Sequence, residues 1–287
     1  GSEAIEGALK LAKRYNNRRE IISCIDAYHG SSHGALSVGG NELFKRAYRP
    51  LLPGVRNIKY GVKEQLDQIS TKTSAIILET IQGEAGIRVA DKQYFKALRE
   101  KCNQTGTLLI LDEVQAGFGR TGKFWAFEHF GIIPDIVVCA KGMGGGMPIG
   151  AFIASKKIME ALKENPLLGH ITTFGGHPVS AAASLATINV ILEEKLIETV
   201  EEKAELFKSL LKHPKIKEIR NKGLMMAVAF DSFDILKPII DRCIEDGVIT
   251  DWFLYCENAM RIAPPLTISK EEIHMACKRI LKAIEEA

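Results

Sequence analysis

No apolar run in the 287-residue sequence approaches the length of about 20 residues that a membrane-spanning helix needs. The six cysteines are scattered and form no Cys-x-x-Cys pair, which favours free thiols in a reducing compartment. The net charge is only +3, with acidic and basic residues intermixed, so neither nucleic acid nor an anionic membrane is indicated as a partner. We therefore expect a cytoplasmic globular protein with no membrane or nucleic-acid partner.

The chain is long enough for one large domain and a smaller one, and 46% of its residues are hydrophobic. In the first part, strand-like apolar runs alternate with amphipathic helices. The expected strands are 20–25, 73–78, 108–111, 135–140 and 149–154, and the expected helices are 3–15 and 91–104. This alternation predicts an α/β domain with a mostly parallel sheet and helices on both faces.

The carboxyl-terminal part has an α+β pattern. We expect a long helix over 179–202 that crosses to this part, strands at 225–230, 248–254 and 260–262, and a helix at 233–246. A final helix follows Ser269, whose side chain forms a capping box with Glu272. We place the large domain at residues 1–190 and the smaller α+β domain at 191–287.

Two polar residues stand at the ends of neighbouring strands of the expected sheet. Asp112 ends the run 108–111, Lys141 follows the run 135–140, and glycine-rich loops come after both. Open α/β sheets bind their ligands at the carboxyl ends of strands. Either residue alone is explained by a strand cap or a solvated loop lysine, but the pair favours a pyridoxal phosphate (PLP) site. There the lysine forms an imine with the aldehyde, and the carboxylate keeps the pyridine nitrogen protonated.

Five segments in the same order along the chain resemble the class III aminotransferases of PLP fold type I, near the acetylornithine and ornithine aminotransferases. They are 79–86, 111–122, 140–142, 172–178 and 261–267, of which 111–122 is highly specific. The resemblance implies PLP fold type I and PLP as the cofactor. It also implies that Lys141 is both the covalent anchor and the base that moves a proton during the reaction, with Asp112 on the pyridine nitrogen.

The resemblance further implies how the rest of the cofactor is held. Glu79 is expected to support the region around Asp112, with a purely structural role as the alternative. His29 is expected to turn the chain away after the aromatic residue. Tyr28 and Val114 are expected to pack on the two faces of the cofactor ring. Gln115 is expected to contact the 3′ oxygen of the ring, and the phosphate is expected to be held by Gly1, Ser2 and Thr173. In this family the threonine reaches across from the partner subunit, so a homodimer is expected.

Arg261 is the candidate for gripping the substrate carboxylate, because a guanidinium fork matches a carboxylate bidentately. The alternative for Arg261 is a surface ion pair. The resemblance implies a switch in which Glu84 pairs with Arg261 while the far amine of a substrate reacts and releases it when 2-oxoglutarate binds. The expected reaction is transfer of the terminal amine of an acetylornithine-like or ornithine-like donor to 2-oxoglutarate, which gives a semialdehyde and glutamate.

The chain departs from this pattern at three positions. Thr80 stands where the family usually has proline, Ile171 where ornithine- and acetylornithine-type members commonly have glycine, and His177 where asparagine is commoner. The branched side chain at 171 is expected to narrow the site near the partner's cofactor. The identity of the amino donor therefore stays open, and a GABA-type or lysine-type transaminase or an aminomutase is the alternative within the family.

Two alternatives come from outside this family. A nucleotide-binding oxidoreductase could use 142–146 as a phosphate loop, but that loop does not have the G-x-G-x-x-G spacing. The resemblance also implies that a stretch preceding Gly1 is missing, so an inactive fragment is the second alternative. His29 and His33 have the spacing of a metal pair, but no third ligand of matching type lies nearby in the sequence, and no metal site is expected.

Overall fold

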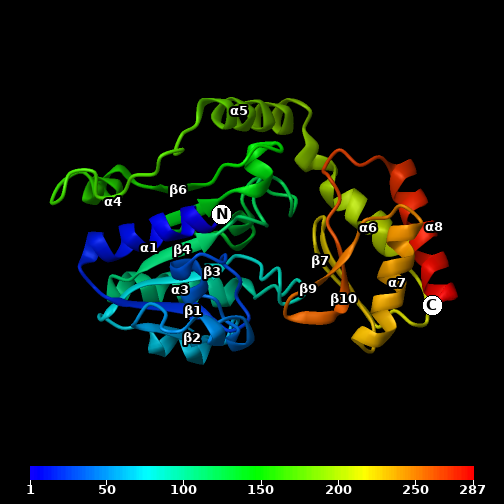
Figure 1. The fold of residues 1–287 in the computed structure, drawn as a ribbon, viewed down its shortest axis with the longest axis horizontal. Coiled ribbons are helices and arrows are strands. Elements are labelled where there is room, and N and C mark those ends of the chain that lie inside the picture. Colours follow the sequence, from blue (N-terminus) through cyan, green and yellow to red (C-terminus); the bar gives the residue numbers. More distant parts are fainter.

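The computed structural model describes every residue from 1 to 287, arranged around two β-sheets (Figure 1). The larger sheet has six strands in the order β2-β1-β3-β4-β5-β6. Its strands are β1 (Glu20–Cys24), β2 (Val55–Ile58), β3 (Thr73–Glu79), β4 (Leu108–Asp112), β5 (Ile136–Cys139) and β6 (Ala151–Ala154). The first five run parallel and β6 is antiparallel to β5, which confirms the mostly parallel sheet.

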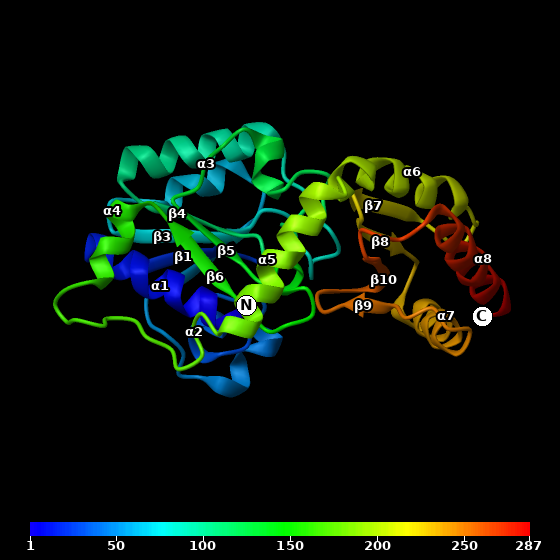
Figure 2. The same cartoon turned by 90° about the horizontal axis from the view of Figure 1, so that it is seen from above.

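Helices cover both faces of this sheet (Figure 2). On one face α1 (Ser2–Asn16) packs its buried Ile5, Ala8 and Leu9 against the strands, with α2 (His33–Ser37) and α4 (Lys156–Met159) nearby. On the other face α3 (Lys92–Thr105) buries Phe95 and Leu98. Strands β3 and β4 are buried along their whole length, as expected for a sheet covered on both sides.

Short 3-10 helices occupy several of the connections. They are η1 (Glu42–Phe44), η2 (Arg46–Tyr48), η3 (Lys63–Gln68), η4 (Ala126–Phe130), η5 (Lys141–Gly144), η6 (Glu160–Leu162) and η7 (Leu196–Thr199). Of these, η5 begins at Lys141, directly beyond β5.

The smaller unit is a four-stranded antiparallel sheet in the order β7-β8-β10-β9, covered by three helices. The strands are β7 (Glu218–Lys222), β8 (Met225–Ala229), β9 (Asp251–Phe253) and β10 (Cys256–Ile262), and the helices are α6 (Val200–Leu210), α7 (Phe233–Glu245) and α8 (Lys270–Glu286). Helix α8 begins with the predicted capping box of Ser269 and Glu272. The division of the chain near residue 190 stays a prediction.

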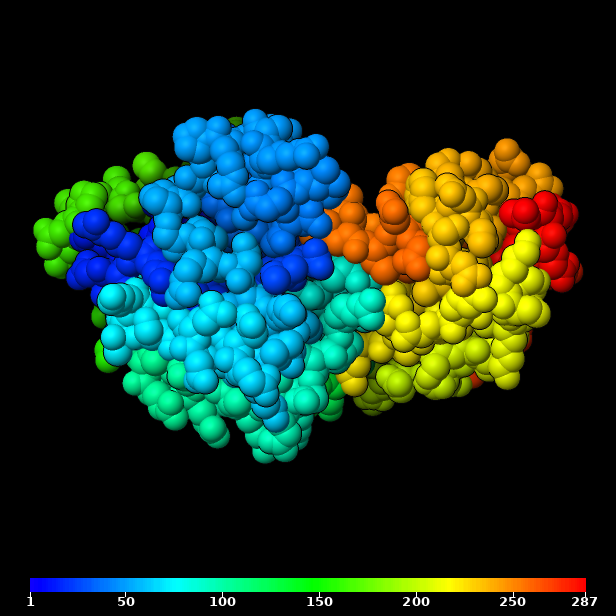
Figure 3. Space-filling view, turned by 90° about the horizontal axis from the view of Figure 1, so that it is seen from below, coloured from blue at the N-terminus to red at the C-terminus, as the bar shows by residue number.

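The expected single helix over 179–202 is wrong in detail. Helix α5 (Pro178–Glu193) ends before Lys195, which has a left-handed φ of 52°, and the chain then passes through η7 into α6. A left-handed residue interrupts the helical hydrogen bonds, so the crossing consists of two helices with a turn between them. The space-filling view shows the two units side by side, with β9 and β10 in orange against the larger unit (Figure 3). None of the helices is long and apolar enough to cross a membrane.

Candidate active site

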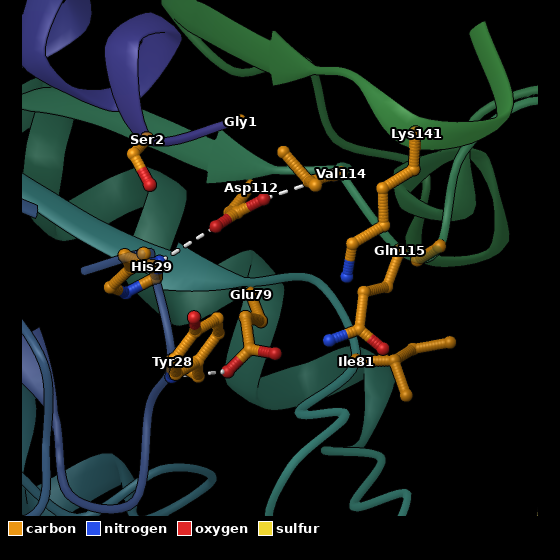
Figure 4. Close-up of a pocket in the computed structure, with 12 residues that line it drawn as sticks. Gly1, Ser2, Tyr28, His29, Glu79, Ile81, Asp112, Val114, Gln115 and Lys141 are labelled. Atoms are coloured by element: carbon orange, nitrogen blue, oxygen red, sulfur yellow. Dashed lines mark hydrogen bonds and ion pairs between the residues drawn. The ribbon is translucent and has the colours of Figure 1, made fainter. Parts of the chain in front are cut away.

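A cavity lies at the carboxyl ends of β3 and β4, where the sequence placed the site (Figure 4). Glu79 and Asp112 are direct partners in the register of β3 and β4, so their side chains leave the sheet side by side. Nine of the twelve predicted site residues line this cavity, and the other three, Glu84, Thr173 and Arg261, lie outside its lining. Its lining consists of Gly1, Ser2, Tyr28, His29, Gly30, Glu79, Ile81, Asp112, Val114, Gln115, Ala116 and Lys141.

The first turn of α1 forms one wall of the cavity. The free N–H groups at a helix N-terminus favour an anion, and Gly1 and Ser2 both line the cavity. The Ser2 hydroxyl accepts a hydrogen bond from the Ser31 backbone N–H at 3.3 Å. Gly30 has φ +125° and lies so close to Ser2 that an added Cβ would overlap the Ser2 hydroxyl. Glycine is therefore required at this contact between the turn and the helix.

Asp112 is buried and held by two contacts. Its Oδ2 lies 2.8 Å from Nδ1 of His29, and its Oδ1 accepts a hydrogen bond from the Val114 N–H at 2.9 Å. The His29 Nε2 is buried and has no hydrogen-bond partner. The imidazole thus fixes one carboxylate oxygen in place, a contact between residues 83 positions apart that the sequence analysis did not predict.

Lys141 begins η5 with a left-handed φ of 46°, a conformation that costs a non-glycine residue about 1–2 kcal/mol and often marks a functional site. Its side chain points into the space bordered by Asp112, Glu79 and Gln115 (Figure 4). Burial of the amine lowers the pKa of Lys141, and the nearby Asp112 and Glu84 carboxylates oppose this effect. A lysine with a lowered pKa supplies more of the neutral amine that nucleophilic and base chemistry need.

Glu79 does not bond to Asp112. Its Oε2 accepts the Tyr28 N–H at 3.0 Å and its Oε1 accepts the Gly83 N–H at 2.9 Å. Burial, followed by the neighbouring Asp112 charge, raises the pKa of Glu79 to about 8. Its hydrogen bonds are thus to the backbone of two loops, and its expected support of the region around Asp112 stays a prediction.

Glu84 and Arg261 meet at the boundary between the two units. Arg261 Nη2 lies 2.7 Å from Glu84 Oε2, and the guanidinium carbon sits 4.6 Å from the ring centroid of Phe253. Glu84 also accepts hydrogen bonds from Gln115 Nε2 at 3.1 Å and from the Leu254 N–H at 3.1 Å. Burial is the largest single effect and would raise the pKa of Glu84, but the hydrogen bond and charge of Arg261, together with the hydrogen bonds from the Leu254 N–H and Gln115, outweigh it, so the pKa is lowered.

Thr173 lies outside this cavity. It is exposed in the segment before α5, and its neighbours Ile171 and Thr172 line a second, larger hollow that includes Gly1, Ser2 and Lys141. The predicted contact of Thr173 with a partner subunit's cofactor stays a prediction. His33 begins α2, and the His29 ring faces Asp112.

A fully buried carboxylate that the sequence analysis passed over stands next to the site. Glu113 accepts hydrogen bonds from the Thr80 hydroxyl at 2.6 Å and from the Ala126 and Phe127 N–H groups at 2.8 and 3.0 Å. It therefore ties the end of β3 to the start of η4. The only signal in the sequence was an acidic residue directly after a buried strand, which did not distinguish it from Asp112.

Burial raises the pKa of Glu113 to about 7, from an ordinary value near 4.5. The folded protein then holds its proton more tightly than the unfolded chain, so this stabilisation is complete below about pH 4.5 and is lost as the pH rises through 7. A shift of this size corresponds to roughly 3 kcal/mol of unfolding free energy. We expect urea unfolding between pH 5 and 8 to show a shallower fall in stability for Glu113→Gln than for the wild type. Equal slopes would contradict this origin.

The arrangement fits PLP. A helix N-terminus suited to a phosphate, a buried carboxylate suited to a ring nitrogen and an amine with a lowered pKa surround one cavity, and Tyr28 and Val114 lie on different sides of it (Figure 4). These are the three groups that a flat cofactor with a phosphate, a ring nitrogen and an aldehyde requires.

Comparisons with known proteins identify the family of the chain. The family model for class III aminotransferases matches residues 1–284. The ornithine aminotransferase of Toxoplasma gondii ME49 is 32% identical with a TM-score of 0.92, over 100% of this chain and 71% of that one. A Bacillus anthracis aminotransferase and a transaminase from the marine bacterium Virgibacillus are each 30% identical with a TM-score of 0.92. Both comparisons cover all of this chain, and 75% and 73% of the two relatives. The chain therefore belongs to the class III aminotransferases and is a PLP-dependent enzyme of that family.

Proposed function

We propose that the protein transfers the terminal amine of an ornithine-like or acetylornithine-like amino acid to 2-oxoglutarate, giving a semialdehyde and glutamate. The observation that carries this proposal is the ion pair of Glu84 and Arg261 beside the Lys141 cavity. The T. gondii relative is named an ornithine aminotransferase, which supports a donor of this type. A carboxylate that can neutralise the arginine suits an enzyme that must accept both an amine and a carboxylate at the same place.

Lys141 is proposed as the covalent anchor for the cofactor and as the base. When bound, PLP supplies an aldehyde that links to amines and a ring that accepts electrons. With the cofactor bound, the Lys141 amine would be the base that takes up the proton from the substrate's Cα and gives it back, and its lowered pKa suits this task because the neutral amine must be available to take the proton. Asp112, fixed by His29, would be the partner of the pyridine nitrogen and would favour its protonated form.

Arg261 and Glu84 are proposed to adapt the site to two substrates. While the donor's far amine reacts, Glu84 keeps the guanidinium paired, so no charged group is left without a partner. When 2-oxoglutarate enters, Arg261 turns to its carboxylate, and Glu84 still holds the hydrogen bonds from Gln115 and the Leu254 N–H. A buried carboxylate with two remaining donors tolerates the loss of its arginine.

The other site residues are proposed to hold the cofactor. Gly1 and Ser2 at the N-terminus of α1 bind the phosphate, Tyr28 and Val114 pack on the ring faces, and Gln115 donates to the 3′ oxygen. In the structure the Gln115 amide already donates to Glu84, and its other amide hydrogen is available for this contact.

We further propose a cytoplasmic homodimer in which Thr173 reaches the phosphate of the partner's cofactor. Large apolar side chains are exposed around this residue and along α5, which supports a protein partner there. They are Leu167, Leu168, Ile171, Phe174, Val179, Leu185, Val190 and Leu192. The six free cysteines support the reducing location.

The covalent anchor can be tested directly. We expect the purified protein to be yellow, and borohydride to fix the cofactor permanently on one lysine, because reduction gives a stable secondary amine. Mass spectrometry of the digested protein should find the modified peptide at Lys141. A colourless preparation that stays colourless with added PLP, or modification at another lysine, would contradict the proposal. A panel of amino donors assayed with 2-oxoglutarate then identifies the donor.

A further inference from the structure

Glu79 connects two loops that carry different parts of the site. One carboxylate oxygen accepts the Tyr28 N–H at 3.0 Å and the other accepts the Gly83 N–H at 2.9 Å. Tyr28 lies on the loop after β1, and Gly83 on the loop after β3 that continues to Glu84. The carboxylate itself stands at the end of β3, fixed by the register of the buried sheet.

No side chain of the protein bonds to this carboxylate. Its two oxygens contact only backbone N–H groups, one from each loop, and the nearest acidic neighbour in register is Asp112. A group kept only for local stability would more simply be a neutral residue, because a buried carboxyl without a basic partner is costly. A carboxylate has two equivalent acceptor oxygens, which allows it to bind both loops at once.

The second loop is closely packed where Glu79 binds it. A Cβ on Gly83 would come within 2.8 Å of Gln115 Oε1, so the loop backbone lies directly against this side chain of the site. One residue further along, Glu84 pairs with Arg261 at 2.7 Å. The position of the Gly83 backbone therefore sets where the Glu84 carboxylate meets the arginine.

We propose that Glu79 is a positioning residue that ties the backbone of Tyr28 to the backbone of Gly83, and so fixes the ring-packing tyrosine relative to the Glu84–Arg261 pair. The tie itself follows from the hydrogen bonds, and its effect on catalysis rests on the function proposed above. Glu79 thus keeps a constant distance between Tyr28, which is proposed to pack on the cofactor ring, and the Glu84–Arg261 pair, which is proposed to select the substrate carboxylate.

The test is Glu79→Gln, with Glu113→Gln as the matched control. The glutamine oxygen can accept one of the two N–H groups, while its amide hydrogens face the other N–H, so one loop is released. Glu113 is the same kind of buried carboxyl, one strand over, and it also binds two backbone N–H groups, but those belong to η4. Each variant therefore loses one hydrogen bond to a backbone N–H. Only the bond lost in Glu79→Gln belongs to the connection between the Tyr28 loop and the Gly83 loop.

We expect hydrogen exchange of the holoenzyme to show about tenfold faster exchange at the Tyr28 or Gly83 amide in Glu79→Gln. The Michaelis constant for 2-oxoglutarate and the dissociation constant for PLP should each rise by about tenfold. In Glu113→Gln the faster exchange should fall at Ala126, with both constants within about twofold of the wild type.

Glu79→Asp separates the tie between the loops from the presence of a carboxyl group. Aspartate keeps the carboxyl group but is one methylene shorter, so it cannot reach both loops, and we expect it to behave like Glu79→Gln. Full rescue by aspartate would overturn the proposal, as would unchanged amide exchange in Glu79→Gln or constants that match those of Glu113→Gln. If the wild-type protein does not transaminate, the proposed function fails, while amide exchange and PLP affinity still decide whether the tie exists.

Discussion

Replacement of Lys141 by alanine should abolish transamination while leaving PLP able to bind. The amine is proposed both to anchor the cofactor and to move the proton, and no other lysine lines the cavity. Loss of a positioned base alone costs about 100-fold to 10,000-fold in rate. The contacts from Asp112, Gln115 and the α1 N-terminus remain, so non-covalent binding of PLP is expected to persist.

The measurement is the rate of glutamate formation from 2-oxoglutarate at saturating donor, together with an equilibrium titration of PLP. Lys157→Ala, which removes an exposed lysine of α4, serves as the control and should keep the wild-type rate. Small amines added to Lys141→Ala should restore part of the activity, because they can take up the proton in place of the side chain. Turnover by Lys141→Ala without added amine would refute the assigned role.

Replacement of Arg261 by alanine should weaken binding of 2-oxoglutarate by about 3 kcal/mol or more, which corresponds to a Michaelis constant raised more than about 100-fold. The variant loses the contact proposed for the acceptor carboxylate, and it also leaves the buried Glu84 with one hydrogen-bond donor fewer. The step with the amino donor, in which the arginine is paired with Glu84, should change less.

Two further variants separate these contributions. Arg261→Lys keeps the charge but loses the planar fork, so it should recover only part of the acceptor affinity. Arg261→Ala combined with Glu84→Gln removes the unpaired buried charge, and it should recover stability but not acceptor binding. An unchanged Michaelis constant for 2-oxoglutarate in Arg261→Ala would contradict the assignment.

The sequence predicted five of the six strands of the larger sheet, including the edge strand β6, but missed β2 at the other edge and β7 at one edge of the smaller sheet. Strands β1, β3, β4 and β5 were found because their buried apolar runs have few alternative explanations. Strand β2 was missed because Val55–Ile58 is short and follows a proline-containing stretch that indicated irregular structure. Strand β7 was missed because the polar Glu218–Lys222 is partly exposed at an edge and has no alternating pattern.

The same contrast holds within the site. Asp112 and Lys141 could be placed near each other from the sequence, since both follow strands whose ends meet at one edge of the sheet. The contacts between polar side chains could not be predicted from the sequence, because they depend on how loops that are far apart in the sequence pack together. Examples are the contact of His29 with Asp112 and that of Glu79 with the Tyr28 N–H. The pair of Glu84 and Arg261 was anticipated from the family resemblance and not from any local pattern.

The reversed direction of β6 has a consequence for how this scaffold can vary. Cys139 of β5 pairs with Ala151 of β6, so the segment that carries Lys141 leaves the sheet and returns to the adjacent strand. Both ends of this segment are therefore held by the hydrogen bonds between β5 and β6, and Lys141 lies close to the end that follows β5. The loop between these two strands can therefore vary in length beyond Gly146 while the Lys141 amine keeps its position, whereas Gly145, with its φ of +55° and its close approach to Thr187, cannot be replaced freely.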